Sequence, residues 1–204
     1  MPTYKLIYFN AMGVVEPARF LFALAGQEYE DVRIERENWP DLKKTLPLGQ
    51  LPVLEVDGIK IAQSQAIFRY LARELGFYGG NALESAKIDT VIETLNDFIT
   101  QARKYFFEKD EAKKAEFKKD VLEVQAPKYM KLLEVLLDLN TEGDGFFVGS
   151  KISLADVLVF YAFTDRFDSL QIEVTEPKLK ALLEKIKAHP KMADWLNKRP
   201  KTQF

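Results

Sequence analysis

The sequence predicts an α/β domain followed by an all-helical domain. Over the first eighty residues, apolar runs of strand length alternate with helical patterns, and beyond them apolar residues recur only at helical spacing. Between the two stretches lie Gly76 and Gly79-Gly80, glycines that indicate a linker. We therefore expect one domain at residues 1–79 and a second at residues 82–204.

The first domain shows the order βαβ and then ββα, which predicts a mixed sheet with helices packed on it. Asp57-Gly58 stands between two apolar runs, and this dipeptide favours a two-residue hairpin because both positions need positive φ. Gly26 is the stop signal of the first helix. The expected strands cover residues 5–9, 29–34, 51–56 and 59–61, and the expected helices cover residues 16–26 and 64–75.

The second domain carries helical stripes throughout. Residues 157–163 are apolar all round, which is typical of a helix at the centre of a domain. Just before them, Ser153-Leu-Ala-Asp156 predicts a capping box, a motif that we interpret as structural rather than catalytic. Pro127 is expected to kink or restart its helix.

The charge balance of the chain gives no sign of a nucleic-acid or acidic-membrane partner. Its 204 residues carry 29 Lys and Arg against 31 Asp and Glu, and neither half is basic. The N-terminus enters a strand pattern directly, and no stretch approaches the roughly 18 unbroken apolar residues of a membrane span. We therefore expect a cytosolic protein.

Cysteine and histidine usage narrows the chemistry further. No cysteine is present, which excludes disulfides, zinc–thiolate sites and a cysteine nucleophile. The single histidine, His189, rules out a histidine-rich metal site. It precedes Pro190, where a new helix is expected to start, and we interpret it as a loop residue.

Three features gather at one end of the expected sheet. Tyr8 lies near the end of the first strand, and a phenol can donate a hydrogen bond to a thiolate. Pro52 opens a later strand, where it leaves neighbouring backbone groups free to pair with an extended peptide. Ser64 begins a helix, whose N-terminus attracts a carboxylate. Together they predict a small-peptide site, although each residue taken alone is more often a packed tyrosine, an ordinary strand start or a plain helix cap.

Longer motifs are spread along the chain: Tyr4-Lys-Leu-Ile-Tyr-Phe-Asn10, Glu16-Pro-Ala-Arg19, Trp39-Pro40, Pro47-Leu-Gly-Gln-Leu-Pro-Val-Leu54, Gln63-Ser-Gln-Ala-Ile67, Leu95-Asn-Asp97, Ser153-Leu-Ala-Asp156 and Lys198-Arg-Pro200. In these motifs the chain resembles the sigma-class glutathione transferases, a group that includes invertebrate enzymes and the haematopoietic prostaglandin D synthases. The resemblance covers essentially the whole chain at near-constant spacing. Each motif is weak alone, but together they are highly specific.

The resemblance implies a thioredoxin-like N-terminal domain, a helical C-terminal domain, a homodimer, and glutathione as co-substrate in an enzyme of detoxification. It assigns Tyr8 to the glutathione sulfur as the catalytic residue. It also implies that Trp39 and Lys43 hold the glycine carboxylate, with Gln50 nearby. A lysine suits a carboxylate, although Trp39 and Lys43 are also consistent with plain surface positions.

The resemblance assigns the rest of glutathione to three other places. Leu51 would pair its backbone with the cysteinyl unit, ahead of a cis Pro52. Gln63 and Ser64 would hold the γ-glutamyl end. Asp97 would reach the γ-glutamyl amine of the glutathione bound in the other subunit, where an acid suits an ammonium group, although Asp97 is also consistent with a solvated helix residue.

The second substrate is expected to be an apolar electrophile, bound largely by the helical domain. Aromatic and apolar side chains suit such a pocket, but they fit a protein core equally well. The candidates are Met12, Gly13, Tyr105, Phe106, Tyr161 and Phe204.

One departure from the family pattern concerns the thiolate. Val14 stands near Tyr8 where many relatives carry arginine, so a cation that would lower the pKa of the thiol is missing there. Arg19 or Arg103 is the alternative source of that positive field, because both belong to segments expected near this corner.

A second departure concerns metal binding. The metal-activated prostaglandin synthases carry an all-aspartate cluster where this chain has Glu93, Asn96 and Asp97. Asn96 removes one charge, so we expect no bound metal.

Three functions stay open on the sequence. The leading one is conjugation of glutathione to apolar electrophiles, driven by thiolate stabilisation and proximity. The second is isomerisation of a prostaglandin endoperoxide, with glutathione returned unchanged. The third is a non-enzymatic ligand-binding or crystallin-like protein that kept the fold and lost the activity.

Overall fold

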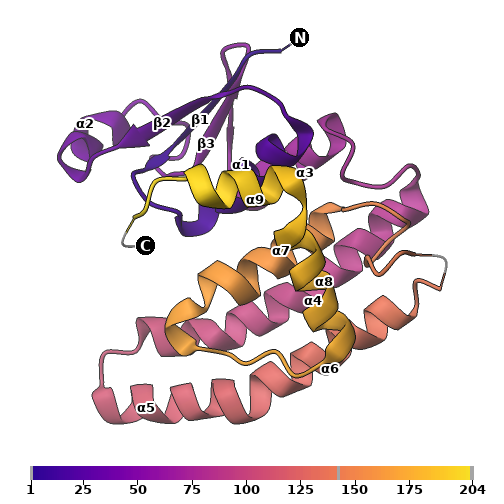
Figure 1. The fold of residues 1–204 in the computed structure, drawn as a ribbon. Helices are drawn as coiled ribbons and strands as arrows, with labels where there is room; N and C mark the ends of the chain where they lie inside the picture. The colour runs from indigo at the N-terminus through magenta and orange to yellow at the C-terminus, as the bar shows by residue number, and fades with distance from the viewer. Residues whose placement is uncertain (1, 142, 203–204) are drawn as a thin grey trace. The chain divides into compact units, whose positions relative to one another are not determined.

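The computed structural model describes residues 2–141 and 143–202 (Figure 1). Contacts between residues divide the chain into two compact units, Met1–Phe77 with His189–Phe204, and Tyr78–Ala188. The expected order of an α/β region followed by helices is confirmed. The expected boundaries, 1–79 and 82–204, place the last helix in the second domain, whereas this division groups it with the first unit. That helix packs on the first helix, a contact between distant residues that has no local signal in the sequence.

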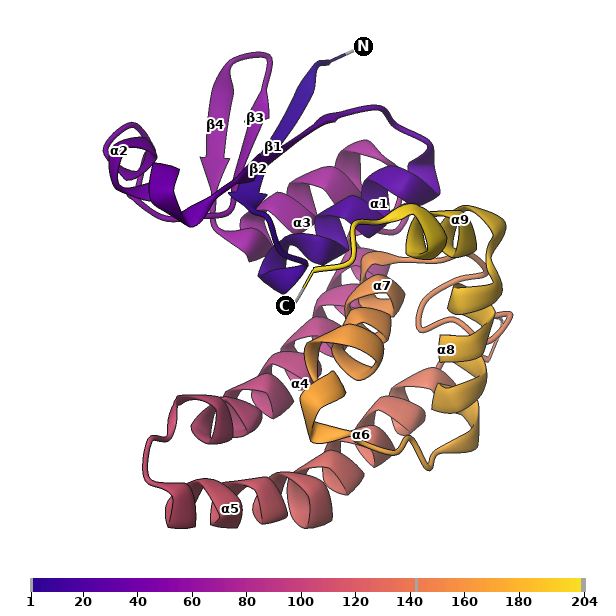
Figure 2. The same cartoon turned by 60° about the vertical axis from the view of Figure 1, so that its left-hand side comes forward.

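The first unit contains a four-stranded sheet in the order β2-β1-β3-β4 (Figure 2). Its central strand β1 (Tyr4–Phe9) pairs in parallel with β2 (Glu30–Ile34) and antiparallel with β3 (Val53–Val56). β3 pairs antiparallel with β4 (Ile59–Ala62). The mixed sheet predicted from the order of elements is thereby confirmed.

The β3–β4 hairpin forms for the reason that its sequence suggests. Asp57 and Gly58 take φ values of 48° and 86°, the left-handed conformation that a tight turn of this kind needs. The Asp57 carboxylate also accepts hydrogen bonds from the backbone N–H and the hydroxyl of Thr3, at 2.8 and 2.9 Å. These bonds hold the pKa of Asp57 below its usual value.

Two long helices of the first unit, α1 (Glu16–Ala25) and α3 (Ser64–Glu74), pack against each other, and α3 also packs on β3 and β4. Gly26 ends α1 in the left-handed conformation at φ 71°, as predicted. The last helix, α9 (Pro190–Lys198), packs on α1, and Lys191 donates a hydrogen bond to the carbonyl of Leu24 at 2.9 Å. The shorter elements are η1 (Gly13–Val15), η2 (Arg36–Asn38) and α2 (Trp39–Lys43).

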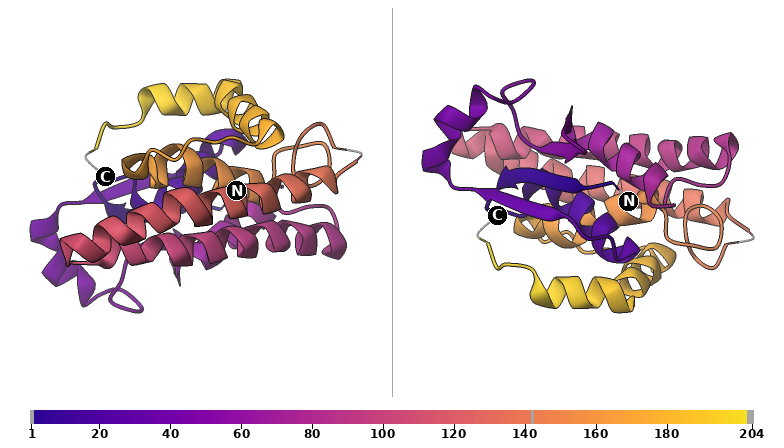
Figure 3. Two further views of the ribbon diagram at one scale, coloured as in Figure 1. Left: turned by 90° about the horizontal axis from the view of Figure 1, so that it is seen from below. Right: turned by 90° about the horizontal axis from the view of Figure 1, so that it is seen from above.

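The second unit is helical in every regular element that the described residues form. α7 (Leu154–Tyr161) is buried along its whole length and contacts both α4 and α8, so it is the central helix, as predicted. α4 and α6 run side by side (Figure 3). Pro127 lies in the first turn of α6, directly after the π-helical turn η3. The chain stays helical from α5 through η3 into α6, so the α-helical pattern is interrupted just before Pro127 but the helix does not restart there. The elements are α4 (Ala82–Phe107), α5 (Glu111–Asp120), η3 (Val121–Gln125), α6 (Ala126–Asp138), η4 (Ala162–Arg166), η5 (Asp168–Leu170) and α8 (Pro177–Ala188).

The capping box at the start of α7 is present. The Asp156 carboxylate accepts hydrogen bonds from the N–H of Ser153 at 2.7 Å and from the N–H of Phe147 at 3.0 Å. Burial raises the pKa of Asp156 to about 6 although these hydrogen bonds oppose the shift. Among the described residues, no helix is both long and apolar enough to cross a membrane.

Candidate active site

The sheet register brings the predicted site residues of the first unit to one end of the sheet, where β1 and β2 finish and β3 begins. Phe9 lies opposite Ile34, so β1 and β2 end together at this edge. Ile7 lies opposite Val53, the first residue of β3, and Val53 lies opposite Ala62, the last residue of β4. Tyr8, Pro52, Gln63 and the chain after β2 therefore all emerge at the same end of the sheet.

Tyr8 is half-buried at this edge, with its ring edge-on to Phe9 at 5.7 Å. The loop after β1 passes close to its hydroxyl. A Cβ atom placed on Gly13 would lie 2.6 Å from the Tyr8 hydroxyl oxygen. Met12 and Gly13, both predicted to line the electrophile pocket, thus belong to the loop that borders the phenol.

The start of β3 is the place where the sequence predicts a peptide-binding segment. Pro52 is buried directly ahead of the first ladder residue, and the Leu51–Pro52 bond is cis, as the family resemblance implies. Leu51 packs against the apolar cluster of Ile7, Leu46 and Val53. The backbone of Leu51 thus lies beyond the end of the β3 ladder, beside the position of Tyr8.

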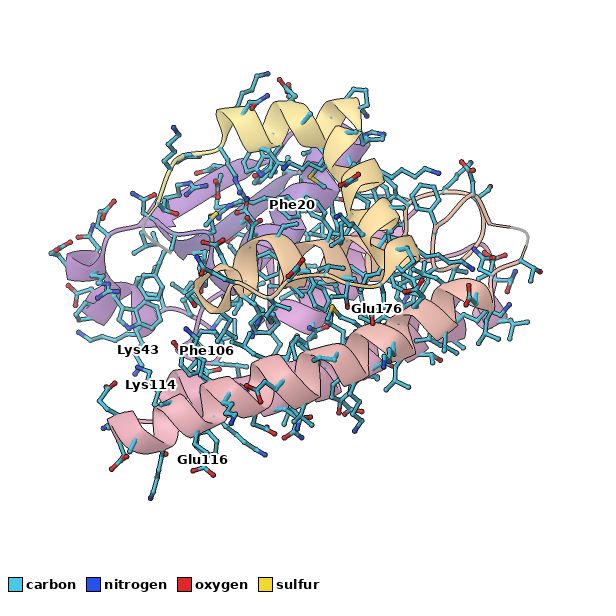
Figure 4. All side chains as sticks on the ribbon, turned by 60° about the horizontal axis from the view of Figure 1, so that its bottom comes forward. Phe20, Lys43, Phe106, Lys114, Glu116 and Glu176 are labelled. Carbon is cyan, nitrogen blue, oxygen red and sulfur yellow. The ribbon has the colours of Figure 1, made fainter. Side chains whose placement is uncertain are left out.

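The segment after β2 places the residues predicted to hold the glycine carboxylate. Trp39 is half-buried, lies edge-on to Phe9 at 5.4 Å and packs on the same apolar cluster, so it also has a structural role. Lys43 is exposed at the end of α2 (Figure 4). Its stem runs past Gly49, where an added Cβ would lie 3.4 Å from the Lys43 Cγ. The exposed Gln50 follows Gly49, so Lys43 and Gln50 are neighbours at one rim of the site.

Gln63 has a backbone conformation that no sequence pattern indicated. Its φ of 75° and ψ of 117° are unusual for a residue other than glycine, and strained conformations of this kind cluster at binding sites. Within the part of the chain that the structure describes, its side chain makes no capping bond to α3. The first amides of α3, beginning at the half-buried Ser64, are therefore available to an anion.

The remaining predicted residues lie in the second unit or outside the described chain. Asp97 is exposed on α4, and the neighbouring Asn96 amide donates to Glu93 at 3.2 Å. No group of three or more histidine, cysteine, aspartate or glutamate side chains within residues 2–141 and 143–202 is placed to hold a metal ion. Phe204 lies outside the described residues.

The aromatic candidates of the second unit differ in exposure. Tyr105 and Phe106 are edge-on to each other at 5.0 Å near the end of α4, and Phe106 is 39% exposed. Phe106 also stacks on Phe167 at 6.1 Å. Tyr161 is 6% exposed within α7, where every residue is buried, which favours the core interpretation that the sequence left open for it.

The two arginines considered as sources of positive field are both engaged elsewhere. Arg19 is fully buried, donates to the Ala11 carbonyl at 2.8 Å and pairs with the carboxylates of Glu16 at 2.9 Å and Asp31 at 3.2 Å. Glu16 also pairs with Arg199 at 3.3 Å and Asp31 with Arg33 at 2.9 Å, so Arg19 belongs to a cluster of mixed charge. Arg103 is exposed and lies over the ring of Phe107, 5.3 Å from its centroid.

The sheet, its α1 and α3 helices and the helical unit together define a thioredoxin-like domain joined to a helical domain, the architecture of glutathione transferases. The sequence matches the family models for the glutathione S-transferase N-terminal domain at residues 4–73 and C-terminal domain at residues 96–199. The chain therefore belongs to the glutathione transferase family, whose co-substrate is glutathione.

Three similar proteins illustrate the range of this family. The chain is 41% identical to the hematopoietic prostaglandin D synthase of Gallus gallus, over 99% of each chain. It is 38% identical to S-crystallin SL11 of Nototodarus sloanii, over 100% of each. The crystal structure of a nematode-specific glutathione transferase from Caenorhabditis elegans superimposes with a TM-score of 0.89 at 38% identity, covering 100% of both chains.

Proposed function

We propose that this chain is a sigma-type enzyme that conjugates the thiolate of glutathione to apolar electrophiles, with Tyr8 donating a hydrogen bond to the sulfur. The observation that carries the proposal is the meeting of three groups at one sheet edge: the phenol of Tyr8, the backbone beside Pro52 and the N-terminus of α3. Each suits a different part of a tripeptide that carries a thiol, two carboxylates and an extended backbone.

The binding roles follow from charge and position. Lys43 attracts the glycine carboxylate, with Trp39 and Gln50 beside it. Leu51 pairs its backbone with the cysteinyl unit, which is the β-edge mode of peptide recognition. Gln63, Ser64 and the α3 N-terminus hold the γ-glutamyl carboxylate.

The proposal includes a homodimer, in which Asp97 of the partner subunit binds the γ-glutamyl ammonium. Its exposed position on α4 leaves the carboxylate accessible to such a ligand. A cytosolic location is part of the proposal, because that compartment keeps glutathione reduced. Sedimentation of the purified chain tests the dimer, and cell fractionation tests the location.

The chemical step forms one carbon–sulfur bond. The thiol proton leaves to solvent, the thiolate attacks the electrophilic carbon, and the displaced group or the rest of the acceptor takes the electron pair. Tyr8 stabilises the negative sulfur, and binding both substrates supplies proximity. Met12, Gly13, Tyr105 and Phe106 are proposed to contact the electrophile, so Phe106→Ala is expected to raise the KM for the electrophile while leaving that for glutathione unchanged.

Turnover assays test this function directly. The purified chain is expected to bind immobilised glutathione and to conjugate at least one of a panel of apolar electrophiles. Tyr8→Phe is expected to lose about 1.5–3 kcal/mol of sulfur stabilisation, a fall of about 10- to 100-fold in rate with a smaller change in glutathione binding. Full activity of Tyr8→Phe would remove the tyrosine from the mechanism.

The similarity to a prostaglandin D synthase favours one second candidate. The same thiolate could open a prostaglandin endoperoxide and be released again after isomerisation, so that glutathione is not consumed. Incubation with the endoperoxide and counting of glutathione thiols separates the two reactions. Glutathione binding without turnover of any substrate would instead favour a crystallin-like role, which the similarity to an S-crystallin makes worth testing.

A further inference from the structure

The loop between β1 and α1 passes so close to Tyr8 that only glycine fits at one position. An added Cβ on Gly13 would lie 2.6 Å from the hydroxyl oxygen, 2.8 Å from Cε1 and 3.1 Å from Cζ of Tyr8. Gly13 also has a φ of 44°, in the left-handed region that glycine enters most easily. Its backbone therefore forms one wall of the space in which the phenol sits.

The same loop is held from behind by groups that are distant in the sequence. The Met12 N–H donates to the Thr202 hydroxyl oxygen at 3.2 Å, and Arg19 donates to the Ala11 carbonyl at 2.8 Å. Both bonds involve backbone atoms directly before Gly13. The loop is thus hydrogen-bonded to the C-terminal segment through Thr202 and to α1 through Arg19.

The C-terminal segment is itself fixed to the start of α1. One oxygen of the buried Glu16 carboxylate accepts from the Trp195 indole at 2.9 Å and from Arg199 at 3.3 Å. The other oxygen pairs with Arg19 at 2.9 Å. A continuous set of hydrogen bonds therefore runs from α9 through Glu16 and Arg19 to the loop that borders the Tyr8 hydroxyl.

We propose that Gly13 is a positioning residue that fixes the Tyr8 hydroxyl for its bond to the glutathione sulfur, and that Thr202 supports it by holding the Met12–Gly13 backbone. This proposal rests on the proposed role of Tyr8. It gives Gly13 a role beyond the electrophile pocket in which the sequence placed it. A displacement of about 1 Å at a reacting group can cost about 100-fold in rate, so a pinned loop matters to the chemistry.

Gly13→Ala is the first test, with Gly58→Ala as its matched control. Gly58 also has a positive φ, 86°, but an added Cβ there meets no atom within 4 Å, so the control carries backbone strain without contact to Tyr8. Gly13→Ala is expected to lower kcat by about 10-fold or more, with the KM for glutathione changed by less than about threefold. Equal effects of the two substitutions would overturn the proposal.

A double-mutant cycle with Tyr8→Phe separates this proposal from the proposed function. If Gly13 acts through the hydroxyl, Gly13→Ala loses most of its effect on kcat once the hydroxyl is absent. The same fall in kcat in both backgrounds would overturn the positioning role while leaving that of Tyr8 intact. Normal kcat in Tyr8→Phe alone would instead remove Tyr8 from the proposed mechanism, and with it the basis of the role of Gly13.

Thr202 provides a second test if Gly13→Ala fails to fold. Thr202→Val keeps the shape and removes the acceptor, whereas Thr202→Ser keeps the hydroxyl. The valine variant is expected to lower kcat by about 3- to 10-fold, which corresponds to the loss of one hydrogen bond. It is also expected to raise the pKa of the bound glutathione thiol. The serine variant is expected to behave like the wild type. Valine and serine variants that behave alike would overturn the supporting role of Thr202.

Discussion

The two units of the molecule bury acidic groups in different ways. In the first unit, Glu16 lies against the fully buried Arg19, which also pairs with Asp31, so opposite charges face each other behind the candidate active site. In the second unit, the fully buried Asp156 is held by the N–H groups of Ser153 and Phe147, with the Ser153 hydroxyl as a further donor.

The difference lies in what offsets the cost of burying the carboxylate. A buried carboxylate facing a cation is compensated by charge, whereas one held by neutral donors keeps part of its desolvation cost. Burial accordingly raises the pKa of Asp156 to about 6. We therefore test the first cluster by removing a partner and the second by changing the pH.

Removal of the buried cation is expected to have the largest effect on stability. Arg19→Met removes the fully buried cation that faces Glu16 and leaves this buried carboxylate only Arg199, at 3.3 Å, which costs about 3–5 kcal/mol of unfolding free energy. The control is Arg36→Met, an exposed arginine of η2 whose replacement is expected to change stability by less than about 0.5 kcal/mol. Denaturant melts measure both. A loss below 1 kcal/mol for Arg19→Met would contradict the charge-compensated description of this cluster.

A pH series on Asp156 measures the second cluster. Because its folded pKa, about 6, exceeds the ordinary value of 3.8, its contribution to stability is full below about pH 4 and is lost as the pH rises through about 6. Asp156→Asn lacks this titration, so the stability of the wild type relative to the variant should fall by about 3 kcal/mol from pH 4 to pH 7. A constant difference across this range would show that Asp156 is not held in a desolvated state.

Loss of the Ser153 side chain is a smaller change in the same cluster. Ser153→Ala removes one helix-cap hydroxyl and is expected to cost about 0.5–2 kcal/mol of stability. Turnover is expected to be unchanged, because we interpret the cap as structural. Melts and kinetics run on the same preparation check this, and lost turnover with an unchanged melting midpoint would assign Ser153 to the chemistry instead.

A new cation at Val14 is expected to have the smallest effect. Val14→Arg should shift the pH–rate curve towards acid by about one pH unit if the side chain reaches the sulfur, because a nearby cation favours the thiolate. Arg103→Ala is the control and should leave the curve unchanged, since that arginine lies over Phe107. A pH–rate curve of Arg103→Ala that moves to higher pH than the wild-type curve would show that Arg103 supplies the positive charge that favours the thiolate.

Local signals in the sequence were enough to predict much of the fold. The Asp57-Gly58 turn, the Gly26 stop and the Ser153–Asp156 capping box each depend on residues close in the chain, and all three are confirmed. The convergence of Tyr8, Pro52 and Ser64 was also predictable, because strand order alone places their segments at one edge.

Features that depend on distant residues could not be read from the sequence. The positive φ of Gln63 has no local marker, since the residue is neither glycine nor asparagine. The contact of Gly13 with Tyr8 and the bond of Thr202 to Met12 exist only once the loop and the C-terminal segment have packed. The sequence also left Arg19 as a source of positive charge near the thiolate. Its ion pairs with Glu16 and Asp31 form only in the folded chain, so no local pattern indicates them.

The most direct test of the central claim is the thiolate absorbance of bound glutathione against pH, in the wild type and in Tyr8→Phe. If the phenol donates to the sulfur, the wild type should show a pKa for the bound thiol below that of free glutathione. Tyr8→Phe should raise this pKa by about one to two units, the equivalent of about 1.5–3 kcal/mol. Superimposable titration curves for the two proteins would contradict the proposed role of Tyr8, because its hydroxyl would then not stabilise the thiolate.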